Sequence, residues 1–380
     1  MWEGEGRTRR PAGAGLRPST NTQPTHNLDR KLPLSYEHTG QRRCAPITGN
    51  LKPKSVVTFT EIQSFTIVAL VTQNVLSAEV TEFRVVPSTT DPRIKTFDTP
   101  HFIYVNREIV VDHKKGLPAD RGQLLLWLTG TGGKASECSA FCKLAANEGY
   151  HVISLMYPDE IPATVCRNDA DPKAFEEFRL AIIQGGATKH ITIDQPESIE
   201  SRLMHLLLAL RTRRPRENWD LFTRDGGIKW ESIVVAGQSQ GGGHAALIGI
   251  RYRVERVICT GAPKDYSKRL KAPAAWYGGE SATSKNRFFA FNHRQDPMGC
   301  TPEQLLSNLH ALKLDLFGDP VDVATEKPPY HHTRILITSY PRVSITDEKS
   351  ALEAHTSVIS NKNEHRMLSV WLYMLTENSD

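Results

Sequence analysis

The residues of this chain best placed to do chemistry surround a serine between two glycines, in the segment Gly237-Gln-Ser239-Gln-Gly241. Four small or β-branched apolar residues, 233–236, precede this turn, and small residues with helical potential follow it. Glycines two residues either side of a serine are typical of a sharp strand-to-helix turn, because a Cβ there would collide with neighbouring backbone. Such a turn presents the serine as a nucleophile, and the helix N-terminus favours the anion formed on carbonyl attack. The alternative is a glycine-rich turn with an incidental serine.

A serine hydroxyl becomes a strong nucleophile only when a base takes its proton and a carboxylate holds that base in the right tautomer. The sequence places Asp296 after the predicted strand 287–292, and His355 in a loop after the predicted strand 333–340. Because loops at the carboxyl ends of parallel strands share one edge of a sheet, we expect Ser239, Asp296 and His355 to meet there. The order Ser, Asp, His is the one that this turn motif requires.

Other residues compete for both roles. The competing aspartates lie beyond a helix from the strand end or just after the last strand, and they are Asp315, Asp319, Asp322 and Asp347. The competing histidines lie before the last strand or within three residues of Asp296, and they are His293, His331 and His332. The alternatives for the predicted pair are a turn-forming Asp-Pro step and a helix-capping or surface histidine. His244, inside the helix after the serine, is expected to pack there or to line the pocket floor.

Buried strands alternate with amphipathic helices along the rest of the chain. Residues 124–128 are apolar throughout, as expected for a strand covered on both faces. Two apolar stretches, 83–86 and 102–111, predict an antiparallel pair at a sheet edge. The alternation predicts an α/β fold with a doubly wound, mainly parallel sheet of about eight strands in one domain, residues 79–380.

Two segments are expected to cover the pocket, near residues 159–190 and 264–284. The second carries Trp276 and Tyr277, which we predict to bind substrate. Between the two segments lies the clearest helix, with apolar residues on one face from Ile199 to Leu210. We predict that a capping box formed by Asp194 and Glu197 opens this helix.

Residues 81–375 resemble the α/β-hydrolase superfamily, on the strength of the turn motif and the order of the three candidates. The segments 198–246, with its Gly-Gln-Ser-Gln-Gly-Gly sequence, and 274–296 are similar to a little-studied group of bacterial hydrolases within it. The resemblance implies the α/β-hydrolase fold and a serine-hydrolase mechanism, with neither a cofactor nor a metal. It implies no particular substrate.

The family pattern places the oxyanion hole at the backbone N–H groups of Thr131 and Gln240, with Gly132 as the alternative to Thr131. Many lipases and esterases have His-Gly after the third strand, whereas this chain has Thr129-Gly130. The change removes a side chain and leaves the backbone donors intact.

The expected activity is hydrolysis of a carboxylic ester, on a small-molecule or polymeric substrate, as in a carboxylesterase. Peptidases and acyltransferases use the same three residues, so they remain alternatives within the enzyme class. A different class of function is a non-catalytic protein of the same fold that binds a glycan or a protein partner. That function predicts a broken triad, whereas all three candidates are present in order.

The formal net charge of +5 is concentrated in residues 1–54, which hold 10 Lys and Arg against 4 Asp and Glu. The remainder is close to neutral, which argues against a nucleic-acid partner. Residues 1–54 are predicted to be a disordered basic tail, which an over-long gene model would explain. Residues 55–78 are predicted to be a signal peptide cleaved after Ala78, too short for a stable membrane span. Its alternative is a strand at 56–71. We therefore expect export, periplasmic or secreted, with a cytoplasmic location as the alternative.

The six cysteines are too few to form a disulfide framework. Cys138 and Cys142 are four residues apart and are expected to pack in the core, because no matching ligands make them a zinc site. Cys166 lies in a predicted loop, where it is available for pairing after export.

Overall fold

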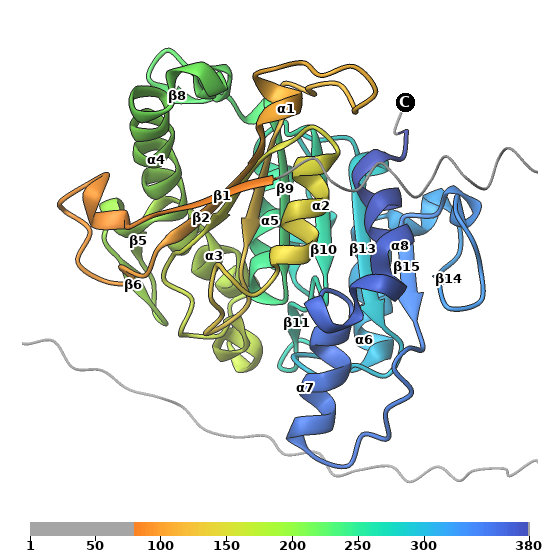
Figure 1. Ribbon diagram of the computed structural model, residues 1–380. Coiled ribbons are helices and arrows are strands. Elements are labelled where there is room, and N and C mark those ends of the chain that lie inside the picture. Colours follow the sequence, from red (N-terminus) through yellow and green to blue (C-terminus); the bar gives the residue numbers. More distant parts are fainter. Residues whose placement is uncertain (1–79, 379–380) are drawn as a thin grey trace, which may run out of the picture. The chain divides into compact units, whose positions relative to one another are not determined.

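A nine-stranded sheet forms the centre of the computed structural model, which describes residues 80–378 (Figure 1). The predicted tail 1–54 and signal peptide 55–78 lie outside the described residues. The strands, in spatial order, are β1 Val80–Val85, β2 His101–Asn106, β4 His151–Leu155, β3 Leu124–Leu128, β9 Ile233–Gln238, β10 Arg256–Thr260, β13 Phe288–His293, β15 Ile335–Thr338 and β14 Val321–Asp322.

In this spatial order, each strand from β4 to β14 pairs in parallel with the next. At the other edge, β2 pairs antiparallel with both β4 and β1. This arrangement confirms the predicted doubly wound, mainly parallel sheet of the α/β-hydrolase fold. The strand beyond the expected number is β14, two residues long and paired with β15 at the other edge. Small antiparallel pairs lie outside the sheet: β5 Gly186–Ala187 with β6 Thr192–Ile193, β7 Thr223–Arg224 with β8 Gly227–Ile228, and β11 Tyr266–Ser267 with β12 Ala272–Pro273.

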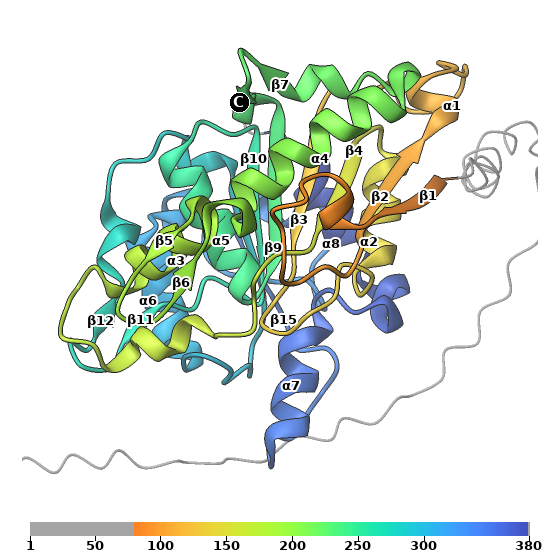
Figure 2. The ribbon, with the colours of Figure 1, turned by 90° about the vertical axis from the view of Figure 1, so that its left-hand side faces the viewer.

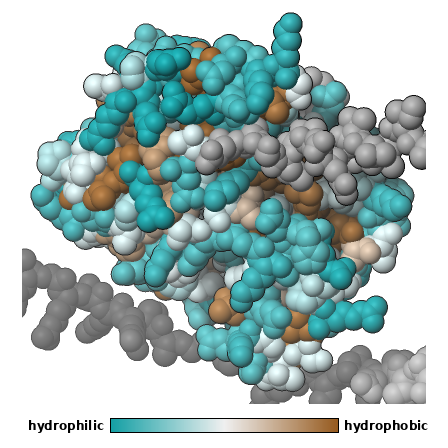
Figure 3. Space-filling model, viewed as in Figure 1, coloured by the Kyte–Doolittle hydropathy of each residue, from teal (hydrophilic) through white to brown (hydrophobic). Residues whose placement is uncertain are grey.

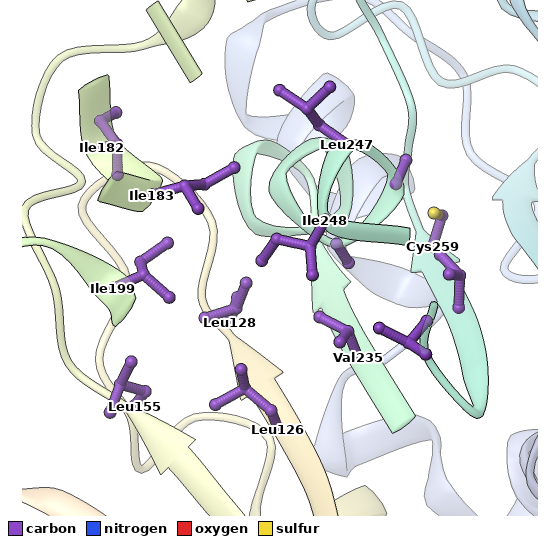
Figure 4. Packing of buried hydrophobic residues seen from close by; sticks show 14 of the residues in the cluster. Leu126, Leu128, Leu155, Ile182, Ile183, Ile199, Val235, Leu247, Ile248 and Cys259 are labelled. Carbon is purple, nitrogen blue, oxygen red and sulfur yellow. The ribbon is translucent and has the colours of Figure 1, made fainter. Parts of the chain in front are cut away.

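Helices cover both faces of the sheet (Figure 2). They are α1 Arg107–Val110, α2 Ser139–Asn147, α3 Ala174–Gln184, α4 Ile199–Arg213, α5 Gln240–Arg251, α6 Pro302–Ala311, α7 Glu348–Ser357 and α8 Glu364–Thr376. Apolar residues of α3, α4, α5 and α6 form one core, and those of α2 and α8 form the other. Strand β3 contributes side chains to both cores. Leu126 and Leu128 belong to the first core, and Leu125 and Trp127 belong to the second. Figure 4 shows Leu126 and Leu128 beside Val235 and Ile248.

Two local predictions were wrong. The strand predicted for 102–111 ends at Asn106, and residues 107–110 form the short helix α1. The capping box at Asp194 and Glu197 is absent, since Ser198 caps α4 by accepting a hydrogen bond from the Ser201 N–H. Glu197 is unavailable for this role because its buried carboxylate accepts the backbone N–H groups of residues 95 and 96.

The face drawn in Figure 3 is mainly hydrophilic, with apolar side chains in small groups. Within residues 80–378, no helix combines the length and the apolar character needed to cross a bilayer. The described cysteines are all free and buried. Cys138 and Cys142 pack in the core beside α8, as expected, and Cys166 packs in the core on the other face, where it is unpaired.

Candidate active site

Ser239 sits at the sharp turn between β9 and α5 with φ 53° and ψ −115°, a backbone conformation rare for a residue with a side chain. Its flanking glycines make the turn possible. A Cβ at Gly237 would lie 2.4 Å from the carbonyl carbon of Gly241, and a Cβ at Gly241 would lie 2.1 Å from the Leu128 oxygen. The Ser239 N–H donates to the Thr260 carbonyl at 2.8 Å. The strained serine is therefore held between three strands of the sheet.

Asp296 and His355 are brought together at the carboxyl end of the sheet. Asp296 follows β13 and is fully buried, and its Oδ2 lies 2.7 Å from His355 Nδ1. Burial raises the pKa of Asp296, but the hydrogen bonds and positive charges of His355 and Lys264 outweigh it and hold the pKa below its usual value. Because this carboxylate is ionised, His355 Nδ1 is the donor, which leaves Nε2 as an acceptor.

His355 lies near the C-terminal end of helix α7, not in a loop as predicted. This helix begins at Glu348, and Asp347 caps it by accepting a hydrogen bond from the Ser350 N–H. Nine residues, 339–347, separate β15 from the helix, and their mostly polar or β-branched composition concealed its start. In Figure 1, α7 lies at the lower end of the sheet, on the same side as β11.

A cavity of about 680 Å³ joins the serine and the histidine, because both line its wall. Both segments expected to cover the pocket contribute, through Pro162, Ala163 and Arg167 on one side and Lys264 on the other. Among the hydrogen bonds within residues 80–378, none joins Ser239 Oγ to His355 Nε2. Such bonds are often long in unliganded enzymes and tighten when substrate binds.

The loop after β3 and the first turn of α5 place two backbone donors at this cavity. The Gly132 N–H donates to the Asp159 carbonyl at 3.2 Å, whereas the N–H groups of Thr131 and Gln240 have no acceptor within residues 80–378. The Gln240 side chain holds the loop in place, because its Oε1 accepts from Thr131 Oγ at 3.1 Å and from the Ala163 N–H at 2.9 Å. Of Thr131 and Gly132, the two candidates for the first oxyanion-hole donor, only Thr131 has a backbone N–H without an acceptor within these residues.

The aromatic pair predicted to bind substrate is placed behind the cavity wall. Trp276 and Tyr277 are buried and contribute nothing to the lining. Instead, Trp276 Nε1 donates to Asp265 Oδ2 at 3.2 Å, and the Tyr277 oxygen accepts from the Asp265 N–H at 2.9 Å. The structure thus assigns them contacts with Asp265, not with the cavity.

The competing acids and bases lie elsewhere. Asp315, Asp319 and Asp347 are exposed, and Asp322 accepts hydrogen bonds from Ser339 and Arg294. The competing histidines contact other groups. His293 contacts the Pro341 carbonyl. His331 contacts Glu326, and His332 contacts Glu377. His244 is buried and does not line the cavity. Its pKa is held well below the usual value, mainly by burial and to a smaller extent by the positive charge of Arg179.

An ion pair that the sequence did not reveal lies beside the first turn of α5. Arg179 of α3 and Asp265 are both 2% exposed, and two hydrogen bonds of 2.6 Å join them. Arg179 also donates to the Gln240 carbonyl at 2.9 Å. A Cβ at Gly243 would lie 2.2 Å from the guanidinium, so glycine gives Arg179 its place against the helix. An arginine among apolar helical residues is the only signal that the sequence offered.

Asp159 supports the loop that carries Thr131. Its Oδ2 accepts from Thr129 Oγ at 3.0 Å, and the carboxyl group is buried. Burial raises the pKa of Asp159 to about 7, with the Thr129 hydrogen bond opposing the rise. This carboxyl group therefore changes charge near neutral pH, in the residue whose backbone carbonyl accepts the Gly132 N–H.

No family model matches the sequence, and no curated protein matches it. A solved structure described as a putative dienelactone hydrolase from Klebsiella pneumoniae subsp. pneumoniae MGH 78578 aligns with 79% of this chain and 100% of its own, at 10% identity and a TM-score of 0.36. TT1662 from Thermus thermophilus aligns over the same shares at 14% identity and a TM-score of 0.37. Because both scores are low, the fold assignment rests on the strand order and connections described above.

We expect Asp265→Leu to lower the free energy of unfolding by about 3–5 kcal/mol, because it leaves the Arg179 charge buried without a partner. Replacing both partners, with Arg179→Met and Asp265→Leu together, should restore most of this loss. Urea unfolding of the full chain measures both. The matched control is Glu176→Gln, which removes the more exposed α3–α5 pair with Arg251 and should cost less than about 1 kcal/mol. An equal loss in the control would contradict the buried-charge argument.

We expect Asp159→Asn to stabilise the protein by on the order of 4 kcal/mol at pH 8 and by less than half of that at pH 5. An unfolded aspartate loses its proton near pH 4, whereas the folded Asp159 keeps it up to about 7. Stability therefore falls as pH rises through this interval, and an amide that cannot ionise avoids the loss. Unfolding midpoints at both pH values test this, with the exposed neighbour Glu160→Gln as control.

Proposed function

We propose that this protein is a serine hydrolase that cleaves carboxylic esters through an acyl-enzyme. The observation that carries the proposal is the 2.7 Å contact between His355 Nδ1 and the buried Asp296, at a cavity that also holds the strained Ser239. A buried carboxylate that orients a histidine, at a cavity that also holds a serine on a strand-to-helix turn, supports nucleophilic acyl transfer.

In the proposed mechanism, His355 Nε2 takes the proton of Ser239 as Oγ attacks the ester carbonyl. Asp296 holds the imidazole in the tautomer with the proton on Nδ1 and stabilises the imidazolium. The negative oxygen of the tetrahedral intermediate accepts hydrogen bonds from the N–H groups of Thr131 and Gln240. His355 then returns the proton to the leaving alcohol, and in the second half it activates water to release the acid.

Apolar side chains line part of the cavity and suit the acyl or alcohol group of an ester. Pro162, Ala163, Met298 and Leu352 supply apolar contacts for an acyl or alcohol group close to Ser239. Leu352 is 48% exposed, so an apolar substrate group would cover it. Peptidase and acyltransferase activities use the same residues, and they are separated from esterase activity by assays on matched ester, amide and acyl-acceptor substrates.

The nucleophile is tested by Ser239→Ala, which should abolish labelling by a fluorophosphonate probe while circular dichroism stays unchanged. Only an activated serine reacts rapidly with such a probe, so labelling reports the site without a known substrate. Ser232→Ala, just before the same strand, is the matched control and should label like the wild type. Labelling that persists in Ser239→Ala would place the nucleophile elsewhere.

The acid is tested by Asp296→Asn, which should lower turnover of a p-nitrophenyl ester by on the order of 10⁴, because the amide removes the charge and favours the wrong tautomer. Asp319→Asn and Asp347→Asn are the comparisons, since Asp319 is exposed and asparagine at 347 still caps α7. If Asp296→Asn stays within about tenfold of the wild type while a comparison variant collapses, the acid has been misassigned.

A further inference from the structure

A lysine shares the carboxylate oxygen that holds the histidine. Lys264, in the loop after β10, places its Nζ 2.6 Å from Asp296 Oδ2, the same atom that lies 2.7 Å from His355 Nδ1. Nζ also lies 3.4 Å from the Asp296 carbonyl oxygen. Lys264 is 9% exposed and Asp296 is fully buried, so solvent screens this pair weakly.

The other groups around Asp296 do not supply this charge. Facing the carboxylate are Lys264 from the β10 loop, His355 from α7 and the thiol of Cys300 from its own loop. Burial raises the pKa of Cys300 to about 12, so this thiol is neutral at ordinary pH. Arg179, the other buried cation of the cavity wall, is already paired with Asp265.

We propose that Lys264 is a fourth functional member of this site, a positioning residue that keeps Asp296 ionised and fixes Oδ2 opposite His355. The inference rests on the proposed function, because it assigns Lys264 a part in the same acid–base pair. It differs from a packing role in its consequence for pH. A buried carboxylate without a cation takes up a proton more readily, and a protonated Asp296 no longer orients the base.

The ammonium thus keeps the carboxylate able to orient the base as the pH falls. Removing the charge should therefore move the acid limb of the activity profile to higher pH.

The test is the pH dependence of kcat/KM for p-nitrophenyl butyrate, together with the pH dependence of fluorophosphonate labelling, in Lys264→Met. We expect the midpoint of the acid limb to rise by on the order of one pH unit in both assays. Lys264→Arg, which keeps the charge, should return the midpoint towards the wild type. Lys264→Gln keeps a hydrogen-bond donor without charge and should behave like Lys264→Met. The exposed Lys268→Met is the matched control and should leave the midpoint in place.

A lower kcat with an unchanged midpoint in Lys264→Met and Lys264→Gln would overturn the proposal and leave Lys264 a structural contact. If Lys264→Met does not fold, Lys264→Gln against Lys264→Arg decides the question, because these differ in charge and both can donate.

A failure of the proposed function is recognised separately, since the wild type would then neither label nor turn over ester. The charge contact is still measurable in that case, from urea midpoints of Lys264→Met, Asp296→Asn and the double variant. We expect the double variant to be more stable than the two single losses combined predict, because neither charge is left alone. Additive losses would show that the two groups do not interact.

Discussion

The close seating of α5 on the sheet is the constraint on which the rest of this site depends. A side chain at Gly237 or Gly241 would overlap backbone atoms of the turn or of β3, so the helix can approach only where glycine stands. This approach sets Ser239 at a positive φ and directs the helix N-terminus at the cavity. It also places Gln240 within reach of the loops that carry Thr131 and Ala163. The conformation of the proposed nucleophile therefore depends on two positions that tolerate no side chain.

Buried charges then link elements that the sheet alone leaves independent. Lys264 and Asp265 are adjacent in the chain, yet one contacts the acid after β13 and the other contacts Arg179 of α3. Through Arg179, the same loop contacts the Gln240 carbonyl in the first turn of α5. Desolvation offsets much of the attraction in buried ion pairs, so their main contribution here is geometric. The β10 loop thereby ties Asp296 to the turn that bears Ser239.

Most of the fold was predictable because its signals are local and periodic. The run 124–128 is apolar throughout, and it forms β3 with both faces covered. The turn at Ser239 was recognisable because glycine is required at fixed offsets, which leaves a mark in the sequence. Asp296 and His355 were selected because each follows a strand, and they do contact each other.

What could not be predicted depends on contacts between distant segments. Glu197 had the spacing of a capping residue, but its carboxylate accepts hydrogen bonds from backbone N–H groups about 100 residues away in the chain. The roles of Arg179 and Lys264 depend on partners 86 and 32 residues away, which no local pattern encodes. Trp276 and Tyr277 were predicted to bind substrate because their segment was expected to cover the pocket, but both hydrogen-bond to Asp265.

Helix α7 carries more than the base. Leu352, His355 and Thr356 lie within about one turn of the helix and line the same cavity. Under the proposed function, one helical face therefore carries both substrate contacts and the proton-transfer group, and the two cannot change independently. A larger residue at 352 would narrow the cavity on the helix that carries His355. Pro162 and Ala163 line the cavity from a separate segment, so side-chain changes there are the more permissive choice for laboratory evolution.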